Sequence, residues 1–398
     1  MTSGPESRAV WLLAIGQTLT YAGVYYAFPA LLPDLQVQTG WSTALLALGP
    51  TLGFLVMAVL TPFTGRIVDR GYGGEMLIWG TVLSAFCVAG LGFVHTPAAW
   101  LGVWSLLGVA QACCLYETCF AFLTRRLGDS ARNAITRVTL VAGFAGTFAF
   151  PFGDVLGRAL GGQNALVVFG AIILVGAVSV NAYGVRALRR LAPAGSNRSL
   201  PADGALRNAM KRAEFWALSA MCALIWLNHG ILLTYVLLLF EDRGASAGMA
   251  TIAAASIGPS QVVSRLILLT NGARVGNVAA TLWSLGCIVM ASVVLMLAGF
   301  APVLVFGVAV LQGAGAGLLS ILRPMLVADL LGRHGFGAIS GGIAVAPILA
   351  TAAAPSFGAA LLHFGGPVTV YISCFVMAAI GLAIGLWLMS RRGGQARG

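Results

Sequence analysis

Long apolar runs follow one another along almost the whole chain, and they limit the fold more than any other feature of the sequence. A helix needs about 20 consecutive apolar residues to cross the hydrocarbon core of a bilayer. The runs cover residues 9–31, 41–64, 76–95, 98–122, 134–158, 164–187, 214–240, 246–270, 275–299, 301–327, 337–363 and 367–390. Because the period-two alternation of a membrane barrel is absent, the runs predict an all-α integral membrane protein with twelve transmembrane helices.

Charged residues are too rare to cover a surface that faces water. They make up 9% of the 398 residues, and hydrophobic residues make up 59%, whereas a soluble domain carries roughly a quarter charged residues. The formal net charge is +11, but the basic residues lie between apolar runs and do not form the stripe of a nucleic-acid-binding surface. We therefore expect a lipid bilayer around the protein and no nucleic-acid partner.

The positions of the basic residues predict the orientation in the membrane. If the N-terminus is cytoplasmic, 19 of the 23 Lys and Arg residues fall in cytoplasmic segments. Arg158 and Arg243 then fall outside, and Arg265 and Arg323 fall within helices. Positive residues gather on the cytoplasmic side of membrane proteins. We expect both termini in the cytoplasm, an even number of spans and a bacterial inner membrane as the location, with the first run a transmembrane helix and not a cleaved signal peptide.

The chain is predicted to consist of two similar halves. Residues 188–212 form the only long polar stretch and predict a cytoplasmic linker between a six-helix bundle at 1–187 and another at 213–398. A constant offset of 204 relates Leu127-Gly128, Ala134-Ile135 and Pro151 to Leu331-Gly332, Ala338-Ile339 and Pro355. Parallel repeats of six helices are known in transporters, with the substrate near the membrane midplane between the halves. The sequence therefore predicts two pseudo-symmetric bundles and a central solute site.

The loop after the second run carries a recognisable motif. Residues 65–71 have the sequence GRIVDRG, which resembles the GxxxDR loop of the major facilitator superfamily. The resemblance implies that Asp69 caps or faces the start of the eleventh helix and helps to lock the outward-facing state, with Arg70 as its neighbour. A helix N-terminus carries partial positive charge and attracts a carboxylate.

A second, shorter resemblance concerns the eighth run. Residues 258–266 (GPSQVVSRL) are similar to the eighth helix of monocarboxylate transporters and of the oxalate–formate antiporter. The resemblance implies that Arg265 pairs with a substrate carboxylate, and Gln261 lies one helical turn before it. The fourth run contains Gln111 but lacks the arginine of many proton-coupled relatives, since Gly108 takes its place.

Ionisable residues inside the other runs are further candidates, because charge within a membrane is costly and usually faces a cavity or a partner. Glu117 is a candidate proton carrier or gate, or one partner of a bridge to an arginine. Arg323 is a second candidate for binding an anion, or it snorkels to the interface. Asp154 and Arg158 are four residues apart, as in a helical ion pair that gates or stabilises the fold.

Polar residues without a fixed charge complete the predicted site. His229, beside Asn228, either binds substrate, titrates, or bonds to a neighbouring helix. Tyr21 and Gln17 in the first run are predicted to line the cavity.

These patterns predict a secondary active transporter for a small organic solute, with an organic anion favoured by Arg265 and protons as the candidate coupling ion. The chain has no GxxxxGK[ST] phosphate loop and no HExxH or GxSxG motif, so we expect neither ATP-driven transport nor an enzyme. The seven cysteines lie in apolar runs without metal-binding spacing, and no cofactor is expected. Efflux of drugs or metabolites by proton antiport and a receptor that does not transport remain the alternatives.

Overall fold

The computed structural model describes residues 4–191, 204–271 and 275–395. Every regular element in these ranges is a helix. The chain divides into two compact units, one formed by Met1–Leu206 with His334–Gly342 and the other by Arg207–Arg333 with Ile343–Gly398. Part of the predicted linker at 188–212 lies outside the described residues, and the predicted domain boundaries stay a prediction.

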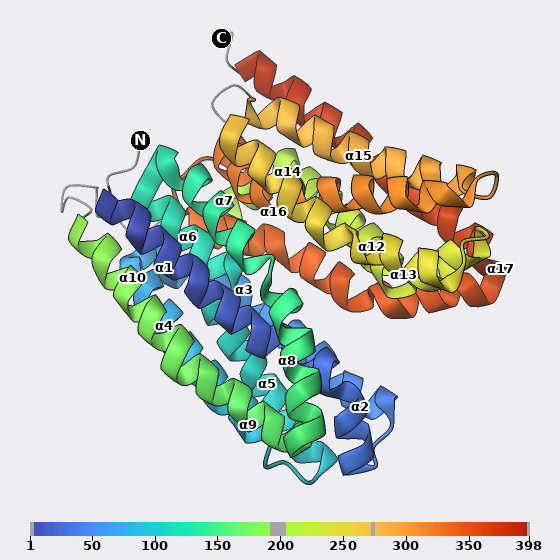
Figure 1. The fold of residues 1–398 in the computed structure, drawn as a ribbon. Helices are drawn as coiled ribbons and strands as arrows, with labels where there is room; N and C mark the ends of the chain where they lie inside the picture. Colours follow the sequence, from blue (N-terminus) through green and yellow to red (C-terminus); the bar gives the residue numbers. More distant parts are fainter. Residues whose placement is uncertain (1–3, 192–203, 272–274, 396–398) are drawn as a thin grey trace. The chain divides into compact units, whose positions relative to one another are not determined.

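The first unit contains the helices that are coloured blue to green in Figure 1. They are α1 (Gly4–Tyr21), α2 (Ala27–Thr39), α3 (Thr43–Ile67), α4 (Gly73–Leu91), α5 (Pro97–Cys114), α6 (Tyr116–Leu127), α7 (Ala131–Ala142), α8 (Ala145–Leu160), α9 (Gly162–Ile172) and α10 (Val178–Leu191). Helix α1 packs against α7 and α10, and α5 packs against α3 and α4. Three five-residue π-helical segments, Ala22–Tyr26, Val68–Tyr72 and Ile173–Ala177, lie between these helices.

The second unit contains the helices coloured yellow to red. They are α12 (Ala213–Asp242), α13 (Ala247–Ala255), α14 (Ile257–Asn271), α15 (Asn277–Leu297), α16 (Val305–Leu331) and most of α17 (Phe336–Gln395), with the short α11 (Ala205–Met210) at the boundary. Helix α16 packs against α12, α14 and α15 and is the most buried of the predicted spans. The first residues of α17 belong to the first unit and the rest to the second.

Local signals explain where the helices begin and end. Ser42, Thr96 and Ser246 precede α3, α5 and α13, and each hydroxyl accepts a hydrogen bond from a backbone N–H of the first turn. Gly128 and Gly332 end α6 and α16 with positive φ angles of 54° and 90°. These two glycines are counterparts in the predicted repeat with offset 204, and both end a helix with a positive φ angle.

Nine helices in the described residues are long and apolar enough to cross a membrane. Two of them, Leu45–Leu91 with 47 residues and Phe336–Arg391 with 56 residues, are far longer than one crossing. Each is interrupted by a glycine with positive φ, Gly71 at 102° and Gly366 at 64°. The polytopic all-α class is confirmed, and the number twelve stays a prediction.

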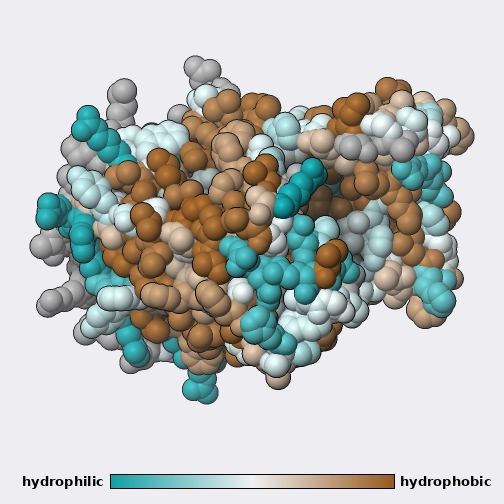
Figure 2. Space-filling model, turned by 60° about the horizontal axis from the view of Figure 1, so that its bottom comes forward, coloured by the Kyte–Doolittle hydropathy of each residue, from teal (hydrophilic) through white to brown (hydrophobic). Residues whose placement is uncertain are grey.

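Many large apolar side chains are exposed on the surface, as expected of a protein that faces lipid. Large side chains such as Trp79, Phe86 and Trp283 expose 69%, 62% and 68% of their area. Figure 2 shows apolar side chains over much of the face it presents. In water, such an extended patch would cause aggregation; in a bilayer it is the contact with lipid.

Three runs predicted as single helices are interrupted. The run at 98–122 breaks at Leu115, which has an extended backbone (ψ −170°) between α5 and α6. The run at 134–158 breaks after Ala142, and the run at 246–270 breaks at Ser256. Backbone polar groups freed inside a membrane must find protein partners. At the breaks after Ala142 and at Ser256, backbone carbonyls accept the N–H bonds of Gly143 and Ser256, whereas side chains of another helix take part at the break at Leu115.

Candidate functional site

Side chains of α1 form hydrogen bonds with the backbone at the break at Leu115. The Gln17 amide Nε2 donates to the Cys114 carbonyl oxygen at 2.9 Å, and the Tyr21 hydroxyl accepts a bond from the Tyr116 N–H at 3.5 Å. On the far side of the break, the Thr118 hydroxyl donates to the carbonyl of Ala112 at 2.8 Å. The structure therefore brings Gln17 and Tyr21, both predicted site residues, to the interruption of the fourth predicted span.

Aromatic rings surround the same break. The ring centroids of Tyr21 and Tyr116 are 4.3 Å apart, and Tyr116 stacks on Phe120 at 4.8 Å. Glu117 begins the first turn of α6, is partly exposed and lies within electrostatic range of Tyr21. Hydroxyl, amide and carboxylate groups among aromatic rings form a small polar centre in an apolar helix bundle. We call Gln17, Tyr21, Tyr116, Glu117 and Phe120 the break site.

Asp69 binds the N-terminus of α17. Its Oδ1 accepts the Gly337 N–H at 2.8 Å, and its Oδ2 accepts the Ala338 N–H at 2.9 Å. These N–H groups lie in the first turn of a helix, where no backbone acceptor is available and the macrodipole favours negative charge. The carboxylate thus lies where the loop resemblance implies, while its locking role stays a prediction.

Close backbone contact makes this cap possible. A Cβ on Gly65 would collide with the backbone of Gly337, and one on Gly341 would collide with the backbone of Thr61. Glycine at these positions lets α3 approach the start of α17. Arg70 is exposed, and it is Arg125, from the last turn of α6, whose Nη1 donates to the Asp69 carbonyl oxygen. The sequence analysis named Arg70 and missed Arg125.

Arg265 is the centre of a second polar cluster, in the second unit. The side chain is only 6% exposed. Its Nε donates to the Gly317 carbonyl at 3.3 Å, and its Nη2 donates to Gln261 Oε1 at 3.2 Å and to Ser320 Oγ at 3.3 Å. These bonds to Gly317, Gln261 and Ser320 orient the guanidinium.

A chain of amide groups links His229 to the backbone of α17. Asn228 Nδ2 donates to the Cys374 carbonyl at 2.8 Å, and Gln312 Nε2 donates to Asn228 Oδ1 at 3.0 Å. The same Gln312 Nε2 lies 3.3 Å from His229 Nδ1. Arg265 is within electrostatic range of His229. We call Arg265, His229, Gln312 and Asn228 the arginine–amide site; it joins three predicted residues to Gln312, which the sequence analysis missed.

The other predicted residues lie elsewhere or are not described. Arg323 is partly buried on α16, three residues beyond Ser320. The Asp154 side chain lies outside the described residues, so its pairing with the exposed Arg158 stays a prediction. Within the described part of the chain, no group of three His, Cys, Asp or Glu side chains is arranged to hold a metal ion.

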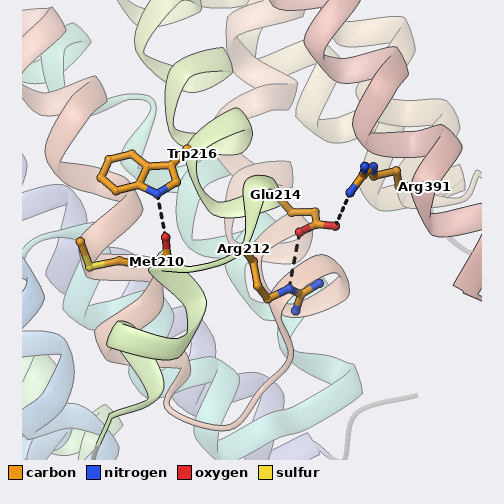
Figure 3. A network of polar contacts seen from close by, with 5 residues as sticks. All are labelled: Met210, Arg212, Glu214, Trp216 and Arg391. Atoms are coloured by element: carbon orange, nitrogen blue, oxygen red, sulfur yellow. Dashed lines mark hydrogen bonds and ion pairs between the residues drawn. The ribbon is translucent and has the colours of Figure 1, made fainter.

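Ion pairs tie together the predicted cytoplasmic end of the second unit (Figure 3). Glu214, at the start of α12, lies 3.5 Å from Arg212 Nε and 3.5 Å from Arg391 Nη1, near the end of α17. Trp216 Nε1 donates to the Met210 carbonyl at 2.8 Å. Tryptophan and arginine are typical of the membrane–water interface, so we interpret this network as an interfacial contact at one end of the unit. None of its residues belongs to either polar site.

A helical protein with apolar spans and buried polar centres is an integral membrane protein. The model of the Major Facilitator Superfamily matches residues 13–346. The chain therefore belongs to the Major Facilitator Superfamily, as the GxxxDR loop indicated.

Solved structures of transporters share the fold. The human organic anion transporter MFSD10 is 18% identical, with a TM-score of 0.72 over 97% of this chain and 100% of its own. A bacterial homologue of the iron transporter ferroportin is 15% identical, with a TM-score of 0.72 over 97% of this chain and 99% of its own. The E. coli fucose:proton symporter FucP is 15% identical, with a TM-score of 0.68 over 95% and 98%.

These neighbours carry chemically different solutes, so the fold alone selects no substrate. No curated protein matches the sequence. The resemblance of the eighth run to monocarboxylate transporters is not confirmed by any of these comparisons, and the role it implies for Arg265 stays a prediction.

Proposed function

We propose that this protein is a secondary active transporter that moves a small organic solute across the cytoplasmic membrane by alternating access, and that the solute carries a carboxylate. Membership of a superfamily of transporters supports the transport activity. The one observation that carries the substrate class is the geometry of Arg265. An arginine cannot discharge by losing a proton, and its planar fork matches a carboxylate in shape and charge.

The surroundings of Arg265 favour substrate binding over a role at the membrane interface. A snorkelling arginine would extend into water, whereas this guanidinium is buried and held from three directions by Gly317, Gln261 and Ser320. Fixed orientation reduces the entropy lost when an anion binds. The adjoining His229 adds a second polar group to the same site.

The break site supports a proposal for coupling. Glu117 is the acidic residue of that site, and the fold holds it at an interruption of a span, where helix geometry can change with little loss of backbone hydrogen bonding. We propose that Glu117 carries the coupling proton or acts as a gate. Twelve spans with both termini cytoplasmic complete the proposed topology, supported by the two overlong helices that glycines interrupt.

A second candidate function is the efflux of lipophilic drugs or metabolites by proton antiport. The rings of Tyr21, Tyr116 and Phe120 favour it, because stacked aromatic surfaces bind apolar or cationic rings without needing an arginine. This function would place the binding step in the break site and would leave Arg265 as a structural or gating residue.

Thermal-shift measurements on the purified protein separate the two candidates. Ligands that bind only the folded state raise its apparent stability. We expect small carboxylates to raise the melting temperature of the wild type but not of Arg265→Ala, and lipophilic cations to have little effect on either. A shift from lipophilic cations that persists in Arg265→Ala, without a carboxylate shift in the wild type, would replace the anion proposal by efflux.

A further inference from the structure

We propose that the amide chain behind His229 fixes its ring as a neutral hydrogen-bond donor, with the proton on Nε2, and that this N–H binds an acceptor oxygen of the solute. The solute-binding part rests on the transport function proposed above. The tautomer itself follows from donor and acceptor chemistry alone. His229 then selects the solute and does not carry the coupling proton.

One group in this series of hydrogen bonds has a role that cannot change. The Cys374 backbone carbonyl can only accept, so the Asn228 atom at 2.8 Å must be the NH₂ nitrogen. Asn228 Oδ1 consequently faces Gln312. An amide oxygen is an acceptor, so Gln312 must present its own NH₂ nitrogen at 3.0 Å. The orientation of both amides is thus set by the backbone.

The Gln312 nitrogen has a second hydrogen, and His229 Nδ1 lies 3.3 Å away. A donor requires an acceptor, so Nδ1 must carry a lone pair and no proton. The neutral imidazole then holds its proton on Nε2.

Rotating the Gln312 amide by 180° would place Oε1 against Asn228 Oδ1, two acceptors in contact. Rotating Asn228 as well would place an oxygen against the Cys374 carbonyl. Neither alternative keeps the chain bonded.

Burial explains why the hydrogen-bonded amides of Asn228 and Gln312 keep His229 neutral, with its proton on Nε2. Asn228 is fully buried and Gln312 is 2% exposed, whereas His229 is partly exposed. Leaving a buried amide group without its hydrogen bond is unfavourable, because the group has also lost its contact with water. Adding a proton to His229 Nδ1 would turn two donors toward each other and break the bond to Gln312. The ring therefore resists the protonation that a proton carrier needs.

The same arrangement defines what the site can bind. The Nε2–H of His229 is a donor, and Arg265, within electrostatic range, offers only donors. These donors fit a solute with carboxylate or carbonyl oxygens.

The tautomer can be measured without any transport assay. The protein is labelled with ¹⁵N only in its four histidines, and the signals that disappear in His229→Asn are assigned to His229. At neutral pH we expect a bare Nδ1 and a protonated Nε2. In Gln312→Glu, where the partner becomes an acceptor, we expect protonation to move to Nδ1. A protonated Nδ1 in the wild type, alone or in an imidazolium ion, overturns the proposal.

Two matched substitutions test the donor role. In His229→Asn the amide oxygen can still accept from Gln312, but the donor at the Nε2 position is lost. His229→Gln places an NH₂ group close to that position. We expect His229→Asn to weaken carboxylate binding about tenfold and His229→Gln less than about threefold. Equal losses in both variants, with unchanged melting temperatures, would refute the donor role.

The measurement of the tautomer and the measurement of carboxylate binding can have opposite outcomes. If the tautomer is as expected but no carboxylate binds the wild type, the proposal of a carboxylate solute is wrong and the fixed tautomer stands. If carboxylates bind through Arg265 but Nδ1 is protonated, the further inference is wrong and the transport proposal stands.

Discussion

The fourth and tenth predicted spans are counterparts in the predicted repeat with offset 204, yet of these two only the fourth is broken. The tenth, α16, is one continuous helix although it contains Gly313, Gly315 and Gly317. The fourth breaks at Leu115, a good helix former. The difference lies in the partners: Gln17 and Tyr21 supply hydrogen bonds at the break, whereas the α16 glycines contact the backbones of α14 and α15. In these two helices, tertiary partners and not glycine content decide where a span is interrupted.

The polar chemistry of the two units differs in the same way. The break site combines a carboxylate with hydroxyl groups at an interruption of a helix. The arginine–amide site combines a cation with oriented amides on α12, α14 and α16. A site whose side chains are already oriented by hydrogen bonds suits recognition, since binding then loses little conformational entropy. A site at a helix interruption suits coupling and movement. In this view the first unit carries coupling and movement, and the second unit recognises the solute. The predictions below test this division.

The largest effect is expected from Glu117→Gln. If Glu117 carries the proton, neutralising it should abolish uptake driven by a pH gradient, because no charged state remains to be protonated. Exchange of solute between the two sides of a vesicle should continue. Proteoliposomes with and without a pH gradient provide the measurement, with His229→Gln as the control that keeps coupling. Undiminished pH-driven uptake in Glu117→Gln would assign coupling to another residue.

Matched substitutions of two arginines test whether recognition belongs to the second unit alone. Arg265→Lys keeps the charge but loses the fork that bonds Gly317, Gln261 and Ser320, so the carboxylate Kd should rise about thirtyfold, near 2 kcal/mol. Arg125→Lys, in the first unit, should leave Kd within about twofold. Isothermal titration in detergent measures both. Comparable losses of carboxylate affinity in Arg265→Lys and Arg125→Lys would contradict the proposal that the second unit alone recognises the solute.

If side chains from another helix stabilise the break at Leu115, Gln17→Leu should destabilise the protein. The substitution leaves the buried Cys114 carbonyl without the amide that binds it, and it should lower the unfolding free energy by about 1–2 kcal/mol. Thr20→Val is the control, because the Thr20 hydroxyl bonds only to Gly16 of its own helix in the described structure. Thermal unfolding of both variants gives the comparison. If Thr20→Val destabilises as much as Gln17→Leu, the amide has no special role at the break.

The sequence predicts the helices well because hydropathy alone decides which segments enter a membrane. The run at 214–240 corresponds to α12, Ala213–Asp242, and the run at 275–299 to α15, Asn277–Leu297. The interruptions could not be predicted, because they depend on contacts across the fold. Gln17 and Cys114 are 97 residues apart in the chain, and no local pattern at Leu115 indicates the bond between them.

The candidate sites show the same limit. Gln261 and Arg265 are one helical turn apart, so their contact is a local feature that spacing predicts. His229, Gln312 and Cys374 come from three helices and meet only in the folded chain. Gln312 could have been predicted from the sequence, because it is an amide residue within an apolar run. The same reasoning was applied to Gln17 but not to Gln312. Arg125 gave no such signal, because it lies among other basic residues at a helix end.

The smallest effect is expected from Asp69→Asn, which tests whether the first unit carries the movement. Asparagine keeps one acceptor oxygen but loses the charge and the second bond, so the cap on Gly337 and Ala338 is weakened by about 1 kcal/mol. Cycling should slow about fivefold, with the solute Kd unchanged, because Asp69 is not part of the arginine–amide site. Initial uptake rates and Kd are measured in parallel.

Glu214→Gln is the matched change for that experiment, since it also neutralises a carboxylate at the end of a helix, but in the second unit and in the ion-pair network of Figure 3. Glu214 is buried, its partner Arg212 is partly exposed and its partner Arg391 is exposed, and this network touches no residue of either polar site. We expect unchanged cycling in Glu214→Gln. A large loss of solute affinity in Asp69→Asn would place Asp69 in the binding site, and equal slowing in both variants would show that any charge lost at a helix end impairs the cycle.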